Sequence, residues 1–507
     1  MLLHHHFEAT AKVQPDKTAL ICGEDRFSYA DVDRHANAVA AALQAAGVVR
    51  GDRVALFLDN GIEFVAGVYG ALKIGAVFMP INPLTKDEKL AYMLADARAV
   101  ALLTGAALEP IWSDALSKVP CVRSVFAAGA SGAAESGRVR AWPSPDAAAR
   151  FEPPQTIDQD LASIIYTSGS TGFPKGVMLT HLNMVSAATS VSTYLGLRGD
   201  DIILCALPLA FDYGLYQVLM GFKLGSTVVL ERNFTFPLTA LEKMARWNVT
   251  VFPGVPTMFA MLVSLEEARL IGLPALRMIT NTAAALPESH IHELRALFPQ
   301  ATLFSMYGLT ECKRVTYLPP DQLDIRPTSV GRGMPNEEVW LVDEEGRRLP
   351  NGSTGELVIR GSNVMRGYWE KPRETAERLK PGPIAGEMIL YSGDVFRTDE
   401  EGWLYFVARR DDIIKSRGEK ISPREVENAI SAMEGVHEVA VVGIPDAVLG
   451  QAVKAFVTLR DGAKLTERDV IRHCLASLEN FMAPKVVEFV ASLPRTDTGK
   501  IKKTGLA

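Results

Sequence analysis

The chain has 507 residues, of which 48% are hydrophobic and 22% are charged, and this composition is typical of a globular protein. A single compact core is not expected at this length, so we predict two or three domains. The chain has a net charge of -6 and no long Lys/Arg block, so we expect no electrostatic attraction to nucleic acid.

The cysteines are scattered, odd in number and without C-x-x-C spacing, which argues against a disulfide framework and against a zinc site. The five are Cys22, Cys121, Cys205, Cys312 and Cys474. This pattern is typical of a reducing compartment, so we expect a cytoplasmic protein. The start of the chain lacks the features of a signal peptide, and we expect no membrane span.

The first predicted elements alternate between helix and strand. Three histidines at positions 4–6 leave a metal site or a tag remnant open, but we expect a solvated N-terminus. Apolar spacing predicts a helix over 31–46, a strand over 54–58, a helix over 63–74 and a strand over 76–81. The alternation repeats over 161–303 and predicts an α/β fold with largely parallel sheets covered by helices.

The later part of the chain changes in character. Residues 127–154 are rich in Ala, Gly, Ser and Pro and indicate a variable surface segment, whereas 330–406 indicate a β-rich subdomain. Beyond them we predict a helix over 423–432, strands over 436–444 and 452–459, and a helix over 466–478. We therefore expect a large N-terminal domain over 1–410, with two βαβ-type sheets and the β-rich subdomain, and a small α+β domain over 411–507.

A predicted buried strand at 161–166 runs into a loop of Thr, Ser and Gly that reaches Lys175. Glycines let backbone N–H groups approach phosphate oxygens, hydroxyls donate further bonds, and lysine adds charge. A P-loop needs Gly directly before Lys and Ser or Thr after it, whereas Pro174 and Gly176 flank this lysine. The loop therefore predicts a polyphosphate site outside the P-loop class, with a plain flexible loop as the alternative.

Five motifs follow one another in a recognisable order. They are YTSGSTGFPKG at 166–176, YGLTE at 307–311, YSGD at 391–394, RRDDIIKSRG at 409–418 and PRTDTGK at 494–500. Together they resemble the signatures of the AMP-forming acyl-CoA synthetase, adenylation-domain and luciferase superfamily, over nearly the whole chain. The resemblance implies ATP-dependent activation of a carboxylic acid to an acyl-adenylate with release of pyrophosphate, then thioester formation with CoA.

The resemblance also implies roles for individual residues. The β- and γ-phosphates of ATP would be held by Thr167, Ser168, Gly169, Ser170, Thr171, Gly172 and Lys175. The rest of the nucleotide would be bound by Thr282, Ala283, Ala284, Tyr307, Gly308, Asp394 and Arg409. Thr310 would contact the α-phosphate and Glu311 would bind Mg²⁺. Lys500 would bridge the substrate carboxylate and the α-phosphate. Two departures from the family pattern are Ala408, where glycine is usual, and Asn281-Thr282, where Ser-Gly is usual.

In this family the small C-terminal domain moves between the two steps. Asp411 matches the hinge position. The domain would first present Lys500 and then rotate to bring the region of Gly418 to the thiol-acceptor channel, where Phe211 matches a gating aromatic. Glycine at 418 suits a close approach of the acceptor's pantetheine arm to the backbone.

The implied acyl pocket contains Asp212, Tyr213, Tyr216, Pro253, Asn281, Met306, Arg314 and Val315. In amino-acid-activating members an aspartate at the place of Asp212 pairs with the α-ammonium of the substrate, but this carboxylate also suits a helix start. Arg314 would bind a polar or anionic group of the acid or reach solvent. A long unfunctionalised alkyl chain is not expected.

Only seven residues follow Lys500, so we expect the acceptor to be CoA or a separate carrier protein. One alternative is a stand-alone adenylation enzyme that loads an amino acid or similar small acid onto the phosphopantetheine of a free acyl or peptidyl carrier protein. A second is an enzyme whose acyl-AMP goes elsewhere, including oxidation. A third is a nucleotide-binding regulator without catalysis, against which the presence of Lys175, Glu311 and Lys500 argues.

Overall fold

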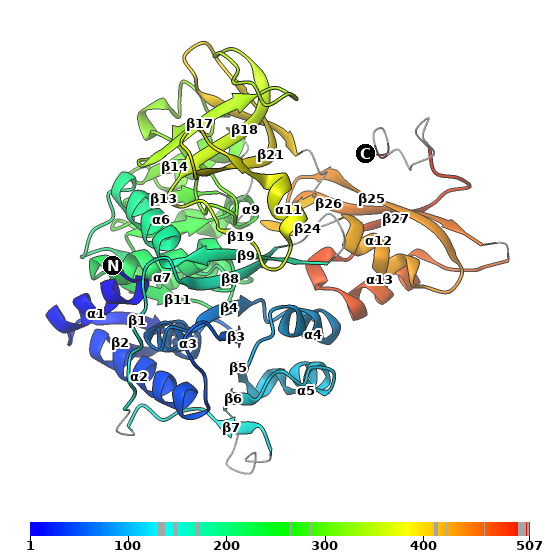
Figure 1. The fold of residues 1–507 in the computed structure, drawn as a ribbon. Coiled ribbons are helices and arrows are strands. Elements are labelled where there is room, and N and C mark those ends of the chain that lie inside the picture. Colours follow the sequence, from blue (N-terminus) through cyan, green and yellow to red (C-terminus); the bar gives the residue numbers. More distant parts are fainter. Residues whose placement is uncertain are drawn as a thin grey trace.

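The structure is a computed structural model that describes residues 1–129, 137–146, 150–167, 173–263, 265–282, 286, 288–409, 414–421, 423–460, 462–494, 503 and 506. Figure 1 shows a large unit, formed by the described residues up to 409, and a small unit that projects from it, formed by those from 414 onward. The N-terminus lies on the large unit, on the side away from the small unit.

The first sheet of the large unit has nine strands in the order β16-β15-β14-β13-β12-β10-β11-β1-β2. Its strands are β1 (Thr18–Cys22), β2 (Asp25–Ser28), β10 (Ile202–Cys205), β11 (Thr227–Leu230), β12 (Val251–Gly254), β13 (Met278–Asn281), β14 (Thr302–Tyr307), β15 (Thr316–Leu318) and β16 (Arg332–Gly333). Neighbours from β14 to β1 pair in parallel. Parallel strands end at one edge, which is where α/β proteins bind ligands.

The second sheet has eight strands in the order β19-β9-β8-β4-β3-β5-β6-β7. Its strands are β3 (Arg53–Phe57), β4 (Val77–Ile81), β5 (Ala101–Gly105), β6 (Ser124–Ala128), β7 (Val139–Ala141), β8 (Leu161–Thr167), β9 (Lys175–Thr180) and β19 (Gly367–Tyr368). The strands from β8 to β7 pair in parallel, whereas β9 pairs antiparallel with both β8 and β19.

Helices cover these sheets. They are α1 (Leu3–Val13), α2 (Tyr29–Ala45), α3 (Ile62–Lys73), α4 (Asp87–Asp96), α5 (Glu109–Ser117), α6 (His181–Tyr194), α7 (Asp212–Leu224), α8 (Pro237–Arg246), α9 (Pro256–Val263), α10 (Glu288–Leu297) and α11 (Pro372–Arg378), with short 3₁₀ helices η1 (Ala106–Leu108), η2 (Glu266–Leu270) and η3 (Pro320–Gln322). α2 starts at a capping box, because Ser28 accepts a hydrogen bond from the Asp31 backbone and donates to its carboxylate. α3 is apolar and buries every residue except Glu63, as expected of a helix enclosed on all sides.

The β-rich subdomain forms the top of the large unit in Figure 1 and is built on an antiparallel sheet. It contains β17 (Glu337–Val342), β18 (Thr354–Gly361), β20 (Leu379–Pro381), β21 (Met388–Thr398) and β22 (Leu404–Arg409). The small unit has a sheet of its own, packed against two helices and a 3₁₀ turn. It contains β23 (Ile414–Ser416), β24 (Glu419–Ile421), α12 (Pro423–Ser431), β25 (Val436–Asp446), β26 (Gly450–Leu459), α13 (Glu467–Ser477), η4 (Asn480–Met482) and β27 (Val486–Phe489).

The predicted fold class is confirmed, as an α/β large unit with two sheets and a β-rich subdomain beside a small α+β unit. The helices predicted at 31–46 and 63–74 are α2 and α3, and their ends differ from the prediction by one or two residues. The predicted surface segment at 127–154 includes the end of β6 and the short strand β7. The proposed boundary at 410 and the hinge residue Asp411 lie outside the described residues.

The expectation of a solvated N-terminus is wrong. α1 packs on the large unit, and its Leu3 and Phe7 belong to the hydrophobic core. His4 is also buried, at 6% exposure, and its ring meets that of His181 at 5.9 Å between centroids. Burial lowers the pKa of His4 to about 2, so this histidine is neutral at physiological pH. The apolar face of α1 outweighs the polar character of the histidine run.

Among the described residues, no helix is both long enough and apolar enough to cross a bilayer.

Candidate active site

A cavity of about 90 Å³ lies where the carboxyl ends of β13 and β14 meet the small unit. Thr282 directly follows β13, and Gly308 and Thr310 follow β14, so the two strands place all three at one edge of the sheet. The described residues that line the cavity are Leu207, Pro208, Phe211, Asp212, Tyr213, Val255, Thr282, Gly308, Leu309, Thr310, Lys313, Arg314, Arg417, Gly418 and Glu419.

The predicted phosphate loop connects β8 to β9, which form a hairpin with Thr167 paired to Lys175. The middle of the loop, with Ser168, Gly169, Ser170, Thr171 and Gly172, lies outside the described residues. The Lys175 ammonium lies over the Tyr368 ring, 5.5 Å from its centroid, and the Tyr368 hydroxyl donates to Glu311 Oε1 over 2.8 Å. Tyr368 therefore joins the lysine of the loop to the carboxylate expected to hold magnesium.

The turn after β14 depends on glycine at 308. A Cβ there would lie 2.2 Å from the Lys313 carbonyl oxygen, because the chain folds back on itself between the two residues. The Lys313 amide donates to the Leu309 carbonyl over 2.7 Å, which closes the turn. Lys313 itself has a positive φ of 74°, a backbone conformation that residues other than glycine rarely adopt. The turn thus fixes Thr310 and the lysine relative to the sheet edge.

Tyr307 and Asp394, which are both expected to bind the nucleotide, contact each other in the structure. The Tyr307 hydroxyl donates to Asp394 Oδ2 over 2.6 Å, and both side chains are buried. The Tyr307 ring packs edge-on against Phe396, at 4.8 Å between centroids. Ala283, Ala284 and the side chain of Arg409 lie outside what the structure describes.

The residues expected in the acyl pocket divide into two groups. Asp212, Tyr213 and Arg314 line the cavity, and Asp212 is the first residue of α7. The others are buried in or next to the surrounding strands and in α7, and are not among the described lining residues of this cavity. They are Tyr216, Pro253, Asn281, Met306 and Val315.

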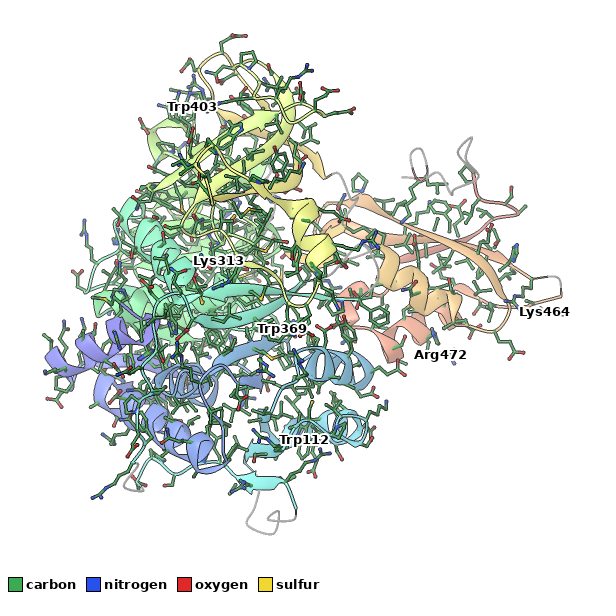
Figure 2. All side chains as sticks on the ribbon, in the orientation of Figure 1. Trp112, Lys313, Trp369, Trp403, Lys464 and Arg472 are labelled. Carbon is green, nitrogen blue, oxygen red and sulfur yellow. The ribbon has the colours of Figure 1, made fainter. Side chains whose placement is uncertain are left out.

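The cavity also contains a buried lysine that the motifs did not point to. Lys313 is 1% exposed, and Figure 2 places it inside the large unit. Its ammonium lies 5.5 Å from the centroid of the Tyr216 ring, and the guanidinium of the next residue, Arg314, lies 4.4 Å from that of Tyr213. Burial lowers the pKa of Lys313 to about 8, against a raising effect of Asp212.

The small unit completes the cavity wall with Arg417, Gly418 and Glu419. Gly418 has a φ of 77°, and a Cβ added there would lie 3.2 Å from the Val255 side chain. Phe211, the expected gating aromatic, lines this cavity and also a second one toward Glu479 and Phe481 of the small unit. Gly418 and Phe211 therefore line the same cavity, whereas Lys500 lies outside the described residues.

A cluster of buried charged side chains joins the large unit to the small unit. Lys89 of α4 pairs with Glu425 of α12 at 2.9 Å and with Glu479 at 2.8 Å. Burial alone would lower the pKa of Lys89, but the two carboxylates raise it to about 12. Burial raises the pKa of Glu419 well above its usual value, and the neighbouring Glu479 adds to this. The contact occurs in the arrangement in which Gly418 lines the cavity.

The comparisons with known proteins agree on one family. A model described as "AMP-binding enzyme" matches residues 7–369, and one described as "AMP-binding enzyme C-terminal domain" matches residues 425–500. The chain belongs to this family. The AMP-binding enzymes most similar to it include a long-chain-fatty-acid–CoA ligase of Bacillus subtilis (strain 168), which is 32% identical over 523 residues that cover 97% of this chain and 91% of that one.

Solved structures of AMP-binding enzymes have the same fold. The amide bond synthetase McbA from Marinactinospora thermotolerans superposes with a TM-score of 0.90 at 27% identity, over 100% of this chain and 99% of that one. The o-succinylbenzoate CoA synthetase (MenE) from Bacillus subtilis, bound with its product analogue OSB-NCoA, has a TM-score of 0.84 at 25% identity, over 98% and 97%. This AMP-binding enzyme is thus an AMP-forming acid–thiol ligase, which activates an acid with ATP and forms a thioester with CoA.

Proposed function

We propose that this ligase converts a small, polar carboxylic acid into its CoA thioester through an acyl-adenylate, with Mg²⁺-bound ATP as co-substrate. The observation that carries the proposal is the cavity in which Thr310 of the large unit and Gly418 of the small unit share one wall with Asp212 and Arg314. An adenylate formed beside Thr310 lies within reach of a thiol that enters beside Gly418, so both half-reactions use one cavity.

The nucleotide would bind across the edge of the first sheet. Thr167 and Lys175 would hold the β- and γ-phosphates together with the loop between them, because hydroxyls, backbone N–H groups and an ammonium suit polyphosphate. The buried Asp394 would accept the ribose hydroxyls, with Tyr307 and Thr282 beside the adenine. The magnesium ion prefers carboxylate and phosphate oxygens, and Glu311 fits it, since its carboxylate hydrogen-bonds Tyr368, whose ring also contacts the lysine of the phosphate loop.

The catalytic role we propose for Lys500 follows from charge. Attack of the acid carboxylate on the α-phosphate gathers negative charge on both partners, and an ammonium between them lowers that barrier. Thr310 would donate a hydrogen bond to the α-phosphate from the opposite side. Domain rotation about Asp411, between a large domain over 1–410 and a small one over 411–507, would exchange Lys500 for Gly418. In the arrangement described here Gly418 occupies the cavity, which supports a state ready for thioester formation.

The acceptor we propose is free CoA. A free acyl or peptidyl carrier protein is the alternative, since both present the same pantetheine thiol. The likeness to an amide bond synthetase adds an amine as a third acceptor to test. We also propose a cytoplasmic location, where ATP and CoA are available, and all five cysteines are free thiols, which suits a reducing compartment.

The acid we propose is short, unlike the long-chain substrates named for several relatives. The cavity of about 90 Å³ has room for several water-sized groups, since one water needs about 10–15 Å³. Its walls carry Asp212, Lys313 and Arg314, and burying an alkyl chain against charged groups would cost their hydration.

Pyrophosphate exchange into ATP tests the first half-reaction. The panel contains amino acids, aryl acids, fatty acids and short polar acids, and we expect exchange with the short polar acids. Exchange with none of them would rule out the proposed function, whereas exchange confined to long fatty acids would rule out the proposed acid class. Acceptors are then compared with the best acid, using CoA, a phosphopantetheinylated carrier protein and a simple amine, and CoA is expected to react fastest.

Replacement of Lys500 by alanine tests the domain rotation. We expect the variant to lose exchange while it still forms much of the thioester from presynthesised acyl-AMP, since Lys500 acts only in the first step. A matched control is Lys485→Ala, which removes an exposed lysine of the small unit paired with Asp446 and should keep both half-reactions. Equal loss of both half-reactions in Lys500→Ala would contradict the two-state scheme.

A further inference from the structure

The inner wall of the acyl cavity carries two basic side chains next to each other in sequence, Lys313 and Arg314. They are 1% and 4% exposed, respectively. Both lie against tyrosine rings, Lys313 over Tyr216 and Arg314 over Tyr213. A tyrosine ring holds a cation in place by a weak electrostatic attraction but does not neutralise its charge. The cavity thus has a cationic end.

The ammonium of Lys313 has no hydrogen-bond partner among the described residues, although it is fully buried. Nε of Arg314 likewise finds no acceptor in the described part of the chain. Buried polar groups are nearly always hydrogen-bonded, and each orphaned one calls for an explanation. For a cation the cost of being unpaired is larger than for a neutral donor. A bound group that accepts hydrogen bonds would remove this cost.

The described lining of the cavity has an excess of positive charge. Its lining residues include three basic ones, Lys313, Arg314 and Arg417, and two acidic ones, Asp212 and Glu419. Burial raises the pKa of Glu419 well above its usual value, which disfavours a second negative charge on this wall. The two buried cations, Lys313 and Arg314, therefore outnumber the charge of Asp212. A ligand that brings one further negative charge would neutralise the inner end of the cavity.

The same arrangement argues against the amino-acid interpretation of Asp212. An α-ammonium beside Asp212 would meet Lys313 as a like charge, since the two residues interact electrostatically. Like charges in a desolvated cavity repel strongly. A helix-start role explains Asp212 only in part, because Phe211 is the N-cap residue of α7. The carboxylate instead balances one of the two resident cations.

The backbone around Lys313 shows that its position is enforced. The residue adopts a positive φ of 74°, and its carbonyl packs where a Cβ of residue 308 would otherwise lie, at 2.2 Å. Such strained conformations persist only where the surrounding structure holds them, and they gather at ligand sites. The turn thus holds Lys313 among the residues that line the cavity.

We propose that Lys313 and Arg314 form an anion subsite, and that the acid activated by this enzyme is a short dicarboxylic acid whose second, unreacting carboxylate binds there. This inference rests on the proposed function. One carboxylate would face Thr310 and the nucleotide, and the other would accept hydrogen bonds from the lysine ammonium and the arginine guanidinium. Charged hydrogen bonds of this kind are among the strongest in proteins.

Matched substrate pairs test the subsite. Malonate, succinate and glutarate are each compared with the corresponding monoamide, which has nearly the same size but a neutral second end. We expect at least one diacid to support pyrophosphate exchange with a kcat/KM at least tenfold above that of its monoamide. Equal efficiency of diacid and monoamide at every length, with exchange still supported by neutral acids, would overturn the subsite and leave the proposed function intact. No exchange with any acid would overturn the proposed function itself.

Variants then locate the subsite. Lys313→Met and Arg314→Met remove one charge each at similar volume, and either should lower kcat/KM for the diacid at least tenfold more than it lowers kcat/KM for the monoamide. Lys464→Met is the matched control, because Lys464 is exposed at the far end of the small unit and should alter neither substrate (Figure 2). An equal fall for diacid and monoamide would place the two residues at the reacting carboxylate and contradict the subsite.

A binding measurement on the unmodified enzyme does not depend on the folding of a variant. In the presence of a non-hydrolysable ATP analogue, the diacid should raise the thermal midpoint more than the monoamide at equal concentration. Equal shifts by the two would again overturn the proposal. Arg314→Lys provides a rescue, since it restores a cation and should recover part of the preference that Arg314→Met loses.

Discussion

The turn after β14 sets the positions of several residues in the candidate site. Thr310 and Glu311 follow β14, and Asp394 lies on β21, where it accepts a hydrogen bond from Tyr307. Lys313 was not predicted, although it lies two residues after Glu311. Lysines are rarely buried, and nothing in a single sequence marks one that is. Only the turn that folds back over Gly308 shows where this side chain points.

Titration of Lys313 gives a prediction at the residue scale. Burial lowers its pKa to about 8, against an ordinary value of 10.5. Below pH 8 the ammonium is charged and attracts the second carboxylate of a diacid, and above pH 8 it becomes neutral. The charged groups around it are Asp212, Arg314 and Glu311, together with the thiol of Cys312 and the hydroxyl of Tyr216, whose pKa burial raises well above 10.

We expect the KM for the diacid to rise above pH 8 by up to about tenfold per pH unit, the limit for a single essential proton. The KM for the monoamide serves as the control and should stay flat over the same range. Parallel curves for the two substrates would contradict the prediction. The free energy of unfolding has the opposite pH dependence. Between pH 8 and 10.5 Lys313 is protonated in the unfolded chain but has lost its proton in the folded chain. The free energy of unfolding therefore increases as pH rises through this window.

At the scale of helices and strands, periodicity predicted most of the fold. α2 alternates apolar and polar residues with helical spacing, α3 is almost wholly apolar, and the strands of the parallel sheets are short apolar runs between the helices. The sequence does not predict α1, because its run of histidines is typical of a solvated chain end. The spacing of Leu3 and Phe7 does indicate a helix, since they lie four residues apart and share one helix face.

The packing of α1 predicts a large effect of a mutation far from the site. Phe7 is 1% exposed, and its ring lies 4.4 Å from that of Tyr69 and 5.5 Å from that of Phe222. Phe7→Ala should lower the free energy of unfolding of the large unit by about 3–5 kcal/mol, because it leaves a cavity between α1, α3 and α7.

Chemical denaturation followed by tryptophan fluorescence measures this change. Val13→Ala at the end of the same helix is the control, since Val13 is 76% exposed and its loss should cost less than about 0.5 kcal/mol. Similar denaturation curves for Phe7→Ala and Val13→Ala would show that α1 does not belong to the core in solution.

At the scale of the whole molecule, the sequence does not predict which residues form the contacts between the large and the small unit. Lys89 and Glu479 lie 390 positions apart, and no local pattern connects them. The family resemblance implied that the small domain moves, but not what holds it in either position. In the structure, Lys89 of α4 pairs with two carboxylates of the small unit, in the arrangement in which Gly418 lines the cavity.

Loss of this lysine should separate the two half-reactions. Lys89→Met leaves Glu425 and Glu479 buried without their shared cation, so the arrangement with Gly418 at the cavity becomes less stable. We expect thioester formation from presynthesised acyl-AMP to slow at least tenfold, which corresponds to about 1.4 kcal/mol, while pyrophosphate exchange persists.

The control for this variant is Lys118→Met. Lys118 forms an exposed ion pair with Asp87 at the start of α4, at 3.0 Å, and exposed pairs contribute little to stability. Both half-reactions should therefore survive in Lys118→Met. A Lys89→Met enzyme that transfers its acyl group at the normal rate would show that the charge cluster has no part in positioning the small unit.

Arg417, Gly418 and Glu419 of the small unit line the same cavity as residues of the large unit. If the small unit rotates between the two half-reactions as proposed, these three residues would contact the acyl group only in the second one. The acid would then be selected twice, first without these residues and later against them. A poorly fitting acid could leave as free adenylate, at the expense of one ATP, before a wrong thioester forms.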